Sequence, residues 1–431
     1  MSAARPRQVA RSVTDAEDWL LGLELFGMRF GLDRMRRLMT ALDAPNKAFR
    51  AVHVVGTNGK SSTVRMIAAL LERHGMRTGA YLSPHLVSFA ERILVGGRQI
   101  SDEELVAALA RARQATSRVD RTLGADDRVT QFEALTAAAY SQLAADHVDV
   151  AVVEAGLGGR WDATNVLDAE VAVLTNVGLE HTRWLGPTVA HIAREKLAVV
   201  APRATLVLGP DLHPDAEAEA EIVAKRQGAT IVRAPAHPSL IEADFELLAR
   251  GEFQRRNFSV ACAAAQALAG ELDGDAVHAA GASTLVPGRF EVVDRGEGAG
   301  EVVLDGAHNA GGMAALAEAL RSYLDGRPLV AVLSVLDDKD AASMLAELLP
   351  LCAGAIFTSN ANPRALSPAT LASLAEQVGA PATIRLQSDP RRALVMARDL
   401  AGDAGVVLAT GSIYLIADLA RPAGAGRRST L

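Results

Sequence analysis

The chain has 431 residues, with 49% hydrophobic residues, 22% charged residues and a formal net charge of −7. This length suits two domains, and the composition is that of a globular protein in water. Aromatic residues make up only 4% of the chain and no long basic run is present, so we expect no nucleic-acid partner. No run of 18 apolar residues and no signal peptide occurs, so we expect a cytoplasmic protein with no membrane partner.

The first two thirds of the chain alternate short apolar runs with segments of helical periodicity. Uninterrupted runs of branched residues predict strands that are buried on both faces of a parallel sheet. Two capping boxes, Ser101–Glu104 and Thr130–Glu133, predict helices at 105–115 and 134–145. The apolar runs lie at Ala51–Val55, Val148–Val153, Glu170–Leu174 and Thr205–Leu208, and a further strand is predicted just before Ser83.

The best domain boundary is Leu285–Arg289, which contains Pro287 and Gly288. Beyond it the alternation restarts, with strands predicted at Glu301–Leu304, Leu329–Leu333, Ala355–Thr358 and Val406–Ala409 and helices at Gly312–Leu324 and Ala341–Leu349. We therefore expect an α/β fold with two domains. Residues 1–286 would form a larger domain on a mainly parallel, doubly wound sheet. Residues 287–422 would form a smaller Rossmann-like α/β domain, and 423–431 a disordered tail.

The most informative segment is Val52–Ser62, VHVVGTNGKSS. Its apolar run ends in a glycine turn before a helix start, which predicts a cradle of backbone N–H groups for phosphate oxygens. Lys60 can reach the outer phosphates, and the hydroxyl of Ser61 or Ser62 can bind Mg²⁺. Val54 stands where the general P-loop has glycine, so the short form Gly56–Lys60 indicates a narrower kind of nucleotide enzyme. We therefore expect the domain 1–286 to be a P-loop ATPase domain.

Three further polar groups follow predicted strands. Ser83, in the segment SPHL, offers a hard oxygen for Mg²⁺, although Ser-Pro is also an ordinary turn. Glu154 ends a buried strand beside the glycine turn at 156–159, where an unpaired charge would be costly and where a P-loop enzyme places its metal-binding acid. His181 could bind a metal as neutral imidazole, although a lone histidine is more often ordinary surface.

Three later segments are less specific by themselves. Lys196, in REK at 194–196, belongs to a helix face with a normal charge pair. Asn257 could reach a nucleotide base or cap the helix that follows. The segment Asp305–Asn309, DGAHN, gathers three polar side chains on a glycine turn after a strand, which favours a binding site over a simple helix cap. Cys262 and Cys352 lack metal-ligand spacing, and Cys262 is expected to fill a core.

The ordered set of these motifs resembles one family. With GTNGKSS, SPHL, EAGLGGRWDATN, LTNVGLEHT, REK, PGR and DGAHN in this order, the chain resembles the folylpolyglutamate synthase/dihydrofolate synthase family of Mur-type ATP-dependent amide ligases. The resemblance extends from about Gly31 to Leu419, and the ordered set is more specific than any single motif.

The resemblance implies roles for individual residues. Lys196 matches a lysine that is carbamylated in the family, which requires its pKa to fall below ~10.4. His308 and Ser412 match positions near the glutamate site, and Thr130, Phe132 and Asp162 lie in motifs near the pterin. The implied catalytic residues are Lys60, Lys196 and His308, and the implied ligands of two Mg²⁺ ions are Ser61, Ser83, Glu154 and His181. The implied ATP contacts are Gly56, Thr57, Asn58, Gly59, Lys60, Ser61, Ser62, Asn257, Arg289 and Asp305.

Four positions depart from the family pattern. Ser61 replaces a usual glycine, so the identity of the Mg²⁺-binding serine stays open. The other departures are Glu180 for Asp, Leu197 for Ala and Ala310 for Pro, and none removes a needed group.

The implied chemistry has two steps. A carboxylate of dihydropteroate or reduced folate attacks the γ-phosphoryl group of ATP, and the amine of L-glutamate then displaces phosphate from the acyl phosphate, with His308 as a candidate proton acceptor. Whether the acceptor is dihydropteroate, a reduced folate or both stays open. The resemblance also implies a monomer, small-molecule partners only, and room for a K⁺ ion.

Three alternatives compete with this interpretation. A related ligase with another acceptor, such as a peptidoglycan-precursor or cyanophycin-type enzyme, would share the fold, but the SPHL block argues against it. A P-loop phosphotransferase or NTPase switch is disfavoured by Val54 and by a second domain that carries DGAHN. A catalytically dead binding protein is disfavoured because competent residues fill every metal and phosphate position.

Overall fold

The computed structural model describes residues 12–24, 31–124, 126–237, 245, 247–294, 300–379, 381 and 383–421. Contacts divide the chain into two compact units. The first takes in the chain up to Gly56, then Thr63–Ala234 and Val260–Ala276, and the second takes in Thr57–Ser62, Pro235–Ser259 and the chain from Val277 onward. The predicted disordered tail, 423–431, lies outside the described residues.

The first unit is built on an eight-stranded sheet with the order β4-β3-β2-β5-β1-β6-β7-β8. Pairing is parallel from β2 through to β8, whereas the β2–β3 and β3–β4 pairs are antiparallel. The strands are β1 (Arg50–Val55), β2 (Thr78–Tyr81), β3 (Ile93–Val95), β4 (Arg98–Gln99), β5 (Val150–Glu154), β6 (Val171–Leu174), β7 (Thr205–Leu208) and β8 (Thr230–Arg233). The predicted mainly parallel sheet is thus confirmed.

The strands predicted from apolar runs lie at the centre of this sheet. β7 has the predicted bounds, β1 begins one residue earlier, and β6 begins one residue later than predicted. β5 starts two residues later and ends one residue later than predicted, so that Glu154 is its last residue. Every residue of β5 and β6 is buried, because neighbouring strands and the layers on both faces exclude water from these apolar runs.

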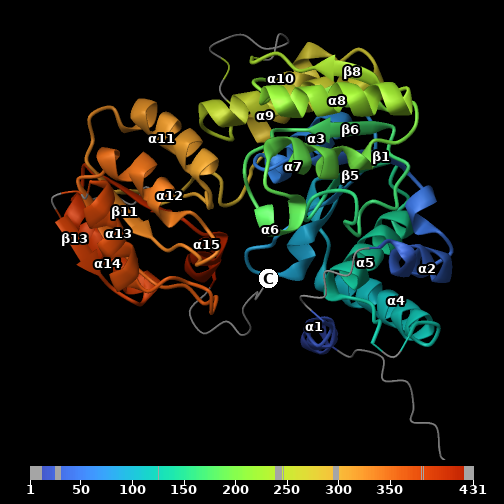
Figure 1. Ribbon diagram of the computed structural model, residues 1–431, viewed down its shortest axis with the longest axis horizontal. Coiled ribbons are helices and arrows are strands. Elements are labelled where there is room, and N and C mark those ends of the chain that lie inside the picture. Colours follow the sequence, from blue (N-terminus) through green and yellow to red (C-terminus); the bar gives the residue numbers. More distant parts are fainter. Residues whose placement is uncertain are drawn as a thin grey trace, which may run out of the picture. The chain divides into compact units, whose positions relative to one another are not determined.

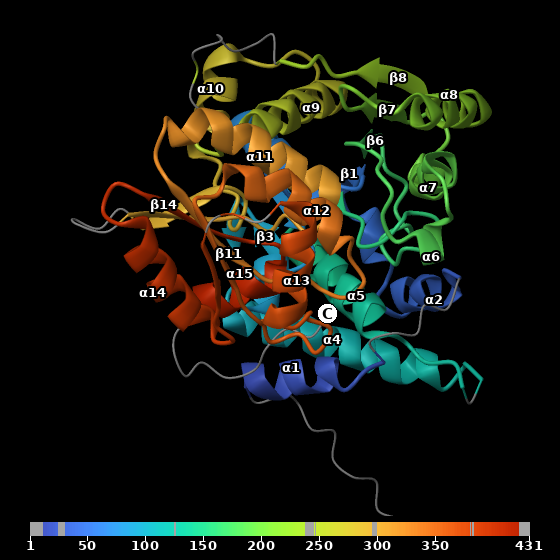
Figure 2. The same cartoon turned by 60° about the vertical axis from the view of Figure 1, so that its left-hand side comes forward.

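Helices pack against the sheet of the first unit in two groups. One core joins the sheet to α1 (Val13–Leu21), α2 (Asp33–Ala41), α4 (Asp102–Asp120) and α5 (Gln131–Ala145). Figures 1 and 2 show α4 and α5 running together. A second core joins β6 and β7 to α7 (Val189–Lys196) and α8 (Pro214–Gln227). The other α-helices described before residue 291 are α3 (Lys60–Arg73), α6 (Thr182–Leu185), α9 (Glu252–Ala269) and α10 (Gly274–Ser283).

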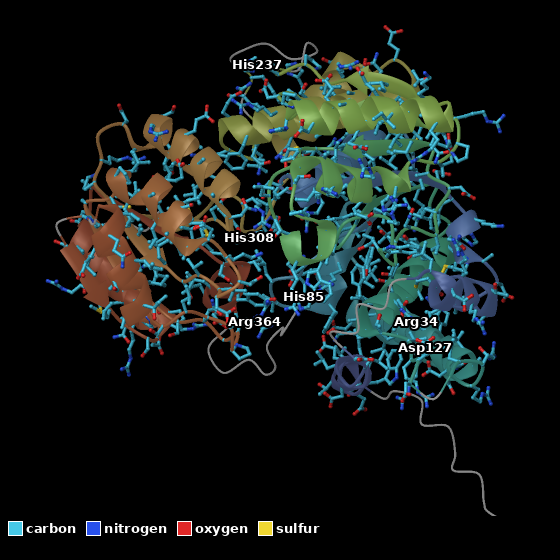
Figure 3. The ribbon with its side chains drawn as sticks, in the orientation of Figure 1. Arg34, His85, Asp127, His237, His308 and Arg364 are labelled. Atoms are coloured by element: carbon cyan, nitrogen blue, oxygen red, sulfur yellow. The ribbon has the colours of Figure 1, made fainter. Side chains whose placement is uncertain are left out.

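Both predicted capping boxes are confirmed, at the first residues of α4 and α5. The box of α5 is more than a local cap, because the Glu133 carboxylate also accepts from the buried Arg34 guanidinium at 3.0 Å. Arg34 reaches Asp127 as well, at 3.0 Å (Figure 3). Burial lowers the pKa of Arg34, but the two carboxylates outweigh this effect and leave the pKa raised. A charged cluster therefore fixes the start of α5.

The second unit holds a six-stranded sheet with the order β13-β12-β11-β14-β10-β9. Only β9 is antiparallel to its neighbour. The strands are β9 (Glu291–Asp294), β10 (Glu301–Leu304), β11 (Leu329–Leu333), β12 (Gly354–Phe357), β13 (Thr383–Leu386) and β14 (Val406–Thr410). The prediction was right for β10 and β11, one residue late for β12, and one residue short for β14.

Helices cover both faces of the second sheet, as expected for a Rossmann-like domain. The main core joins the sheet to α11 (Ala310–Leu324), α12 (Ala341–Leu348) and α13 (Pro368–Val378), which pack side by side (Figure 2). α14 (Pro390–Ala401) packs on β11, β12 and β14, and α15 (Ile413–Ala420) packs on β14 and α14. α11 starts two residues earlier than predicted because Asn309 caps it.

Each unit contains one free cysteine. Cys262 is buried in α9, within the first unit, and Cys352 follows α12 in the second unit. Burial raises the pKa of each thiol to about 12. The structure thus agrees with the prediction that Cys262 fills a core. Among the described residues, no helix is long and apolar enough to cross a membrane.

Candidate functional site

Three neighbouring strands of the first sheet end at the same edge. Val54 of β1 is in register with Glu154 of β5, and Val55 is in register with Leu174 of β6. Gly56, Glu154 and Thr175 therefore stand at the carboxyl ends of three adjacent parallel strands. In open α/β sheets this edge is where ligands bind.

Gly56 is held tightly at this edge. A Cβ at this position would overlap the hydroxyl oxygen of Thr175, so only glycine fits. The Gly56 carbonyl oxygen accepts a hydrogen bond of 2.7 Å from Nζ of Lys196, whose side chain is buried at the end of α7. The structure thus brings Lys196, which the sequence alone left on an ordinary helix face, to the start of the P-loop.

Ser83 and Glu154 also meet at this edge. The backbone N–H of Ser83, which follows β2, donates to Oε2 of Glu154 at 3.1 Å, and Glu154 is only 2% exposed. His181 precedes α6 with a left-handed φ of 51°, and its Nε2 lies 3.5 Å from Oε1 of Glu180. Among the described residues, no three His, Cys, Asp or Glu side chains cluster as a metal site; the predicted ligand set also includes serine hydroxyls.

The SPHL segment is fastened by the residues that follow it. The Glu91 carboxylate accepts from the backbone N–H groups of residues 86–88 at 2.7 to 2.8 Å. Nε of the buried Arg92 donates to Nδ1 of His85 at 2.9 Å, and the His85 ring packs on Phe89 with centroids 4.3 Å apart (Figure 3). His85 is therefore a packed residue of this loop and not ordinary surface.

The P-loop residues 57–62 lie in the second unit. Nζ of Lys60 donates to the Thr57 carbonyl oxygen at 3.2 Å, and Ser62 is buried. The amides of Asn58 and Asn309 donate to each other at 3.2 and 3.0 Å. Gly59 has a φ of 81°, and the Asn257 side chain fills the place of its missing Cβ. The loop conformation therefore requires glycine at 59.

Gln254 holds the Asn257 side chain in one orientation. Nδ2 of Asn257 donates to Oε1 of Gln254 at 3.0 Å, so that the Asn257 oxygen faces Gly59. Gln254 has no exposed surface. Sequence reasoning named Asn257 and missed Gln254, although Gln254 stands three residues before it, one helical turn away.

Asp305 organises the turn after β10. Its carboxylate accepts from the backbone N–H groups of Phe290 and Ala307, each at 2.8 Å. Burial raises the pKa of Asp305, and the nearby charge of Arg289 opposes this rise. The Arg289 guanidinium occupies the space that a side chain at Gly306 would need. Asp305, Arg289 and Gly306 are thus brought together at the turn after β10.

His308 and Ser412 follow the ends of two adjacent strands, β10 and β14. Nδ1 of His308 lies 2.9 Å from the Gly306 carbonyl oxygen (Figure 3). Because a carbonyl only accepts, Nδ1 carries the proton and Nε2 is the basic nitrogen. Ser412 is buried and caps α15 through the N–H of Tyr414 at 3.2 Å.

The residues predicted near the pterin lie between α5 and the loop after β5. Thr130 caps α5, so its hydroxyl is already bonded to Glu133. The Phe132 ring stacks on Tyr81 with centroids 6.3 Å apart, and a Cβ at Gly156 would come within 2.7 Å of Phe132. Asp162, only 6% exposed, accepts from the N–H of Leu157 at 2.8 Å.

Two groups of buried polar residues in this region were missed by sequence reasoning. One is the cluster that Arg34 makes with Glu133, and the other is His53, whose imidazole contacts Thr164. His53 did leave a signal, because it is the one polar residue in the apolar strand VHVV. Arg34 left none, since its partners are about a hundred residues away in the chain.

Comparison with known proteins shows the family of the chain. Residues 54–208 match the Mur ligase middle domain, and residues 288–413 match the Mur ligase glutamate ligase domain. The chain is 37% identical to the dihydrofolate synthase/folylpolyglutamate synthase of Mycobacterium tuberculosis, over 86% of this chain and 83% of that protein. The chain belongs to the dihydrofolate synthase/folylpolyglutamate synthase family.

Solved structures of dihydrofolate synthase/folylpolyglutamate synthase proteins share the fold. Folylpolyglutamate synthase of Mycobacterium tuberculosis complexed with ADP superposes with a TM-score of 0.87 at 34% identity, covering 95% of this chain and 97% of that one. The bifunctional folylpolyglutamate synthase/dihydrofolate synthase of Yersinia pestis, complexed with AMPPNP and Mn ion, gives 0.82 at 27% identity, covering 96% and 98%. The phosphotransferase alternative is therefore wrong, because both Mur ligase domains are present.

Proposed function

We propose that this protein is an ATP-dependent ligase that joins L-glutamate to the carboxylate of dihydropteroate, of a reduced folate, or of both. The observation that carries the proposal is the carboxyl edge of the first sheet. There the Ser83 N–H donates to the Glu154 carboxylate at 3.1 Å. On the neighbouring elements, Nζ of Lys196 donates to the Gly56 carbonyl oxygen at 2.7 Å. Membership of the dihydrofolate synthase/folylpolyglutamate synthase family supports the same activity.

The residues present fit a nucleotide and a divalent metal. Gly56 and Gly59 leave no room for a Cβ, as a backbone cradle for phosphates requires. The carboxylate of Glu154 and the hydroxyls of Ser61 and Ser83 are hard oxygen donors that suit Mg²⁺, with His181 as a further ligand. Asn257, Arg289 and Asp305 would hold the remainder of ATP. The metal would neutralise phosphate charge and favour phosphoryl transfer.

The reaction needs two kinds of help from the chain. The acceptor carboxylate attacks the γ-phosphorus, the bond to the ADP oxygen breaks, and an acyl phosphate forms. Lys60 would offset the repulsion between these anions with its positive charge. The glutamate amine then attacks the acyl carbon and phosphate leaves. Nε2 of His308, the basic nitrogen of its ring, would accept the proton that the amine loses.

Four further features belong to the proposal. Lys196 would be carbamylated and become a carboxylate-like ligand. Its buried side chain, with Nζ 2.7 Å from the Gly56 carbonyl oxygen, supports this role. A K⁺ ion would be an additional activator. The glutamate would lie near His308 and Ser412, and the pterin near Thr130, Phe132 and Asp162. The protein would work as a cytoplasmic monomer.

One assay tests the proposal and identifies the acceptor. Phosphate release from ATP is measured with Mg²⁺ and L-glutamate, and with either 7,8-dihydropteroate or a tetrahydrofolate. Release with dihydropteroate alone indicates a dihydrofolate synthase, release with the tetrahydrofolate alone a polyglutamate synthase, and release with both a bifunctional enzyme. No acceptor-dependent release with either would overturn the folate assignment in favour of another Mur-type acceptor.

The metal assignment is tested at Glu154. We expect Glu154→Ala to require at least ten times more Mg²⁺ for half-maximal phosphate release, because a direct carboxylate ligand is lost. Glu195→Ala is the matched control, since this nearby carboxylate pairs with Arg160 at 2.8 Å instead. An unchanged Mg²⁺ titration in Glu154→Ala would remove Glu154 from the metal site.

A further inference from the structure

A buried imidazole lies in the central strand of the first sheet. His53 has no exposed surface and stands on β1, three residues before Gly56. Its Nε2 lies 2.9 Å from the hydroxyl oxygen of Thr164, which is also fully buried. Nδ1 has no hydrogen-bond partner among the described residues. A buried polar group is costly unless it is bonded, so the contact with Thr164 is the one that stabilises the ring here.

The direction of this hydrogen-bonded chain follows from its last member. The Thr164 hydroxyl donates to Oδ1 of Asp162, because a carboxylate only accepts. The same hydroxyl oxygen then accepts from His53, which places the imidazole proton on Nε2. Burial lowers the pKa of His53 to about 4, so the ring is neutral at physiological pH. The hydrogen bonds therefore lead from His53 through Thr164 to Asp162.

Asp162 uses this support to hold a loop closed. Its carboxylate accepts from the backbone N–H groups of Leu157 and Thr164 as well as from the Thr164 hydroxyl. Burial raises the pKa of Asp162, and hydrogen bonding to the loop opposes the rise. An ionised carboxylate has about four acceptor positions, so the loop itself occupies most of them.

The loop that Asp162 holds, residues 156–165, connects two parts of the proposed site. At one end Gly156 packs against Phe132, with 2.7 Å between the ring and an added Cβ. At the other end Arg160 donates its backbone N–H to the Glu195 carbonyl oxygen at 2.9 Å, beside Lys196. Any movement of the Asp162 carboxylate would therefore shift the part of the loop that packs against Phe132.

We infer that His53 is a positioning residue for acceptor binding, acting through Thr164 and Asp162 on the loop 156–165. This inference rests on the proposed function, since it takes the surface at Phe132 as the place where the pterin part of the acceptor binds. His53 touches neither substrate nor metal in this scheme. It orients the carboxylate that closes the loop.

Two pairs of variants test the network. His53→Leu and Thr164→Val remove hydrogen-bonding atoms with little change in volume, whereas His53→Gln keeps a donor near Nε2 and Thr164→Ser keeps the hydroxyl. We expect about a tenfold rise in the KM for dihydropteroate or tetrahydrofolate in the first pair, as for the loss of one buried hydrogen bond. The KM for ATP should stay within about twofold, and the second pair should resemble the wild type.

A second measurement separates this inference from the proposed function. Amide hydrogen exchange of residues 156–157 should accelerate in His53→Leu and Thr164→Val and stay slow in the conservative variants, with or without substrates. If wild-type protein shows no acceptor-dependent phosphate release, the proposed function fails and exchange alone decides whether the network holds the loop. If His53→Leu does not fold, the comparison of Thr164→Val with Thr164→Ser decides. Equal losses in all four variants, or an unchanged acceptor KM together with unchanged exchange, would overturn the inference.

Discussion

Lys60 shows how a single side chain can be ready for a ligand while it is bonded to its own loop. Its Nζ donates to the neutral Thr57 carbonyl oxygen at 3.2 Å, and an anionic phosphate oxygen would replace this acceptor with an ion pair. We expect Lys60→Ala to lower acceptor-dependent phosphate release at least about 100-fold, as for the loss of one electrostatic stabiliser. Circular dichroism and the melting temperature should stay unchanged.

The exposed Lys225 of α8 offers a matched control for this substitution. Lys225→Ala removes an equal charge away from the P-loop, so activity should stay near that of the wild type. Retained ligation in Lys60→Ala would show that this lysine does not contact the transferred phosphoryl group.

His53 makes stability depend on pH in a predictable direction. Burial lowers its pKa to about 4 from an ordinary value of 6.5. Between these two values the unfolded chain binds the proton and the folded chain does not, so the free energy of unfolding falls as the pH falls. From about pH 7.5 to pH 5, we expect the wild type to lose about 2 kcal/mol more than His53→Gln. Urea unfolding of both proteins at the two pH values measures this difference, and parallel losses would contradict it.

At the scale of elements, the two capping boxes look alike in the sequence and differ in their surroundings. The box of α4 is exposed, whereas in the box of α5 the Glu133 side chain is 8% exposed and paired with the equally buried Arg34. We expect Glu104→Gln to cost less than about 1 kcal/mol of unfolding free energy. Glu133→Gln should cost about 3 kcal/mol, because it leaves a buried guanidinium poorly compensated. Equal costs in urea unfolding would show that the Arg34 pair is not stabilising.

The elements also show what sequence reasoning reaches and where it stops. β7, β10 and β11 have the predicted bounds because each is a short run of mainly apolar residues, with one polar residue at the start of β7 and of β10. The prediction did not include β4 or β13, which have exposed polar residues and no clear alternation. Strand ends located Glu154 and Asp305, since the carboxyl edge follows from the order of elements. The contact between His53 and Thr164 joins residues 111 positions apart, and only the fold brings them together.

At the scale of the whole molecule, each compact unit carries its own thiol. Burial raises the pKa of Cys262 and Cys352 to about 12, so at pH 8 the folded protein holds far less reactive thiolate than an unfolded chain. We expect each thiol to react with a disulfide reagent at least about 100-fold more slowly in the folded protein than in denaturant. Cys352→Ser leaves only the thiol of the first unit, and Cys262→Ser leaves only that of the second. Rapid labelling of Cys262 in the native protein would contradict its burial.

The edge strands of the two sheets affect whether copies of this protein can associate by strand pairing. β4, β8, β9 and β13 have between two and four residues each, and all carry charge, at Arg98, Arg233, Glu291 and Arg385 respectively. Arg233 is further tied to Glu217 and Glu221 of α8. A strand from another molecule that paired with such an edge would have to strip water from these charges for only a few backbone bonds. The charged edge strands thereby oppose the addition of a further strand to either sheet, which would otherwise extend the apolar sheet centres from one molecule to the next.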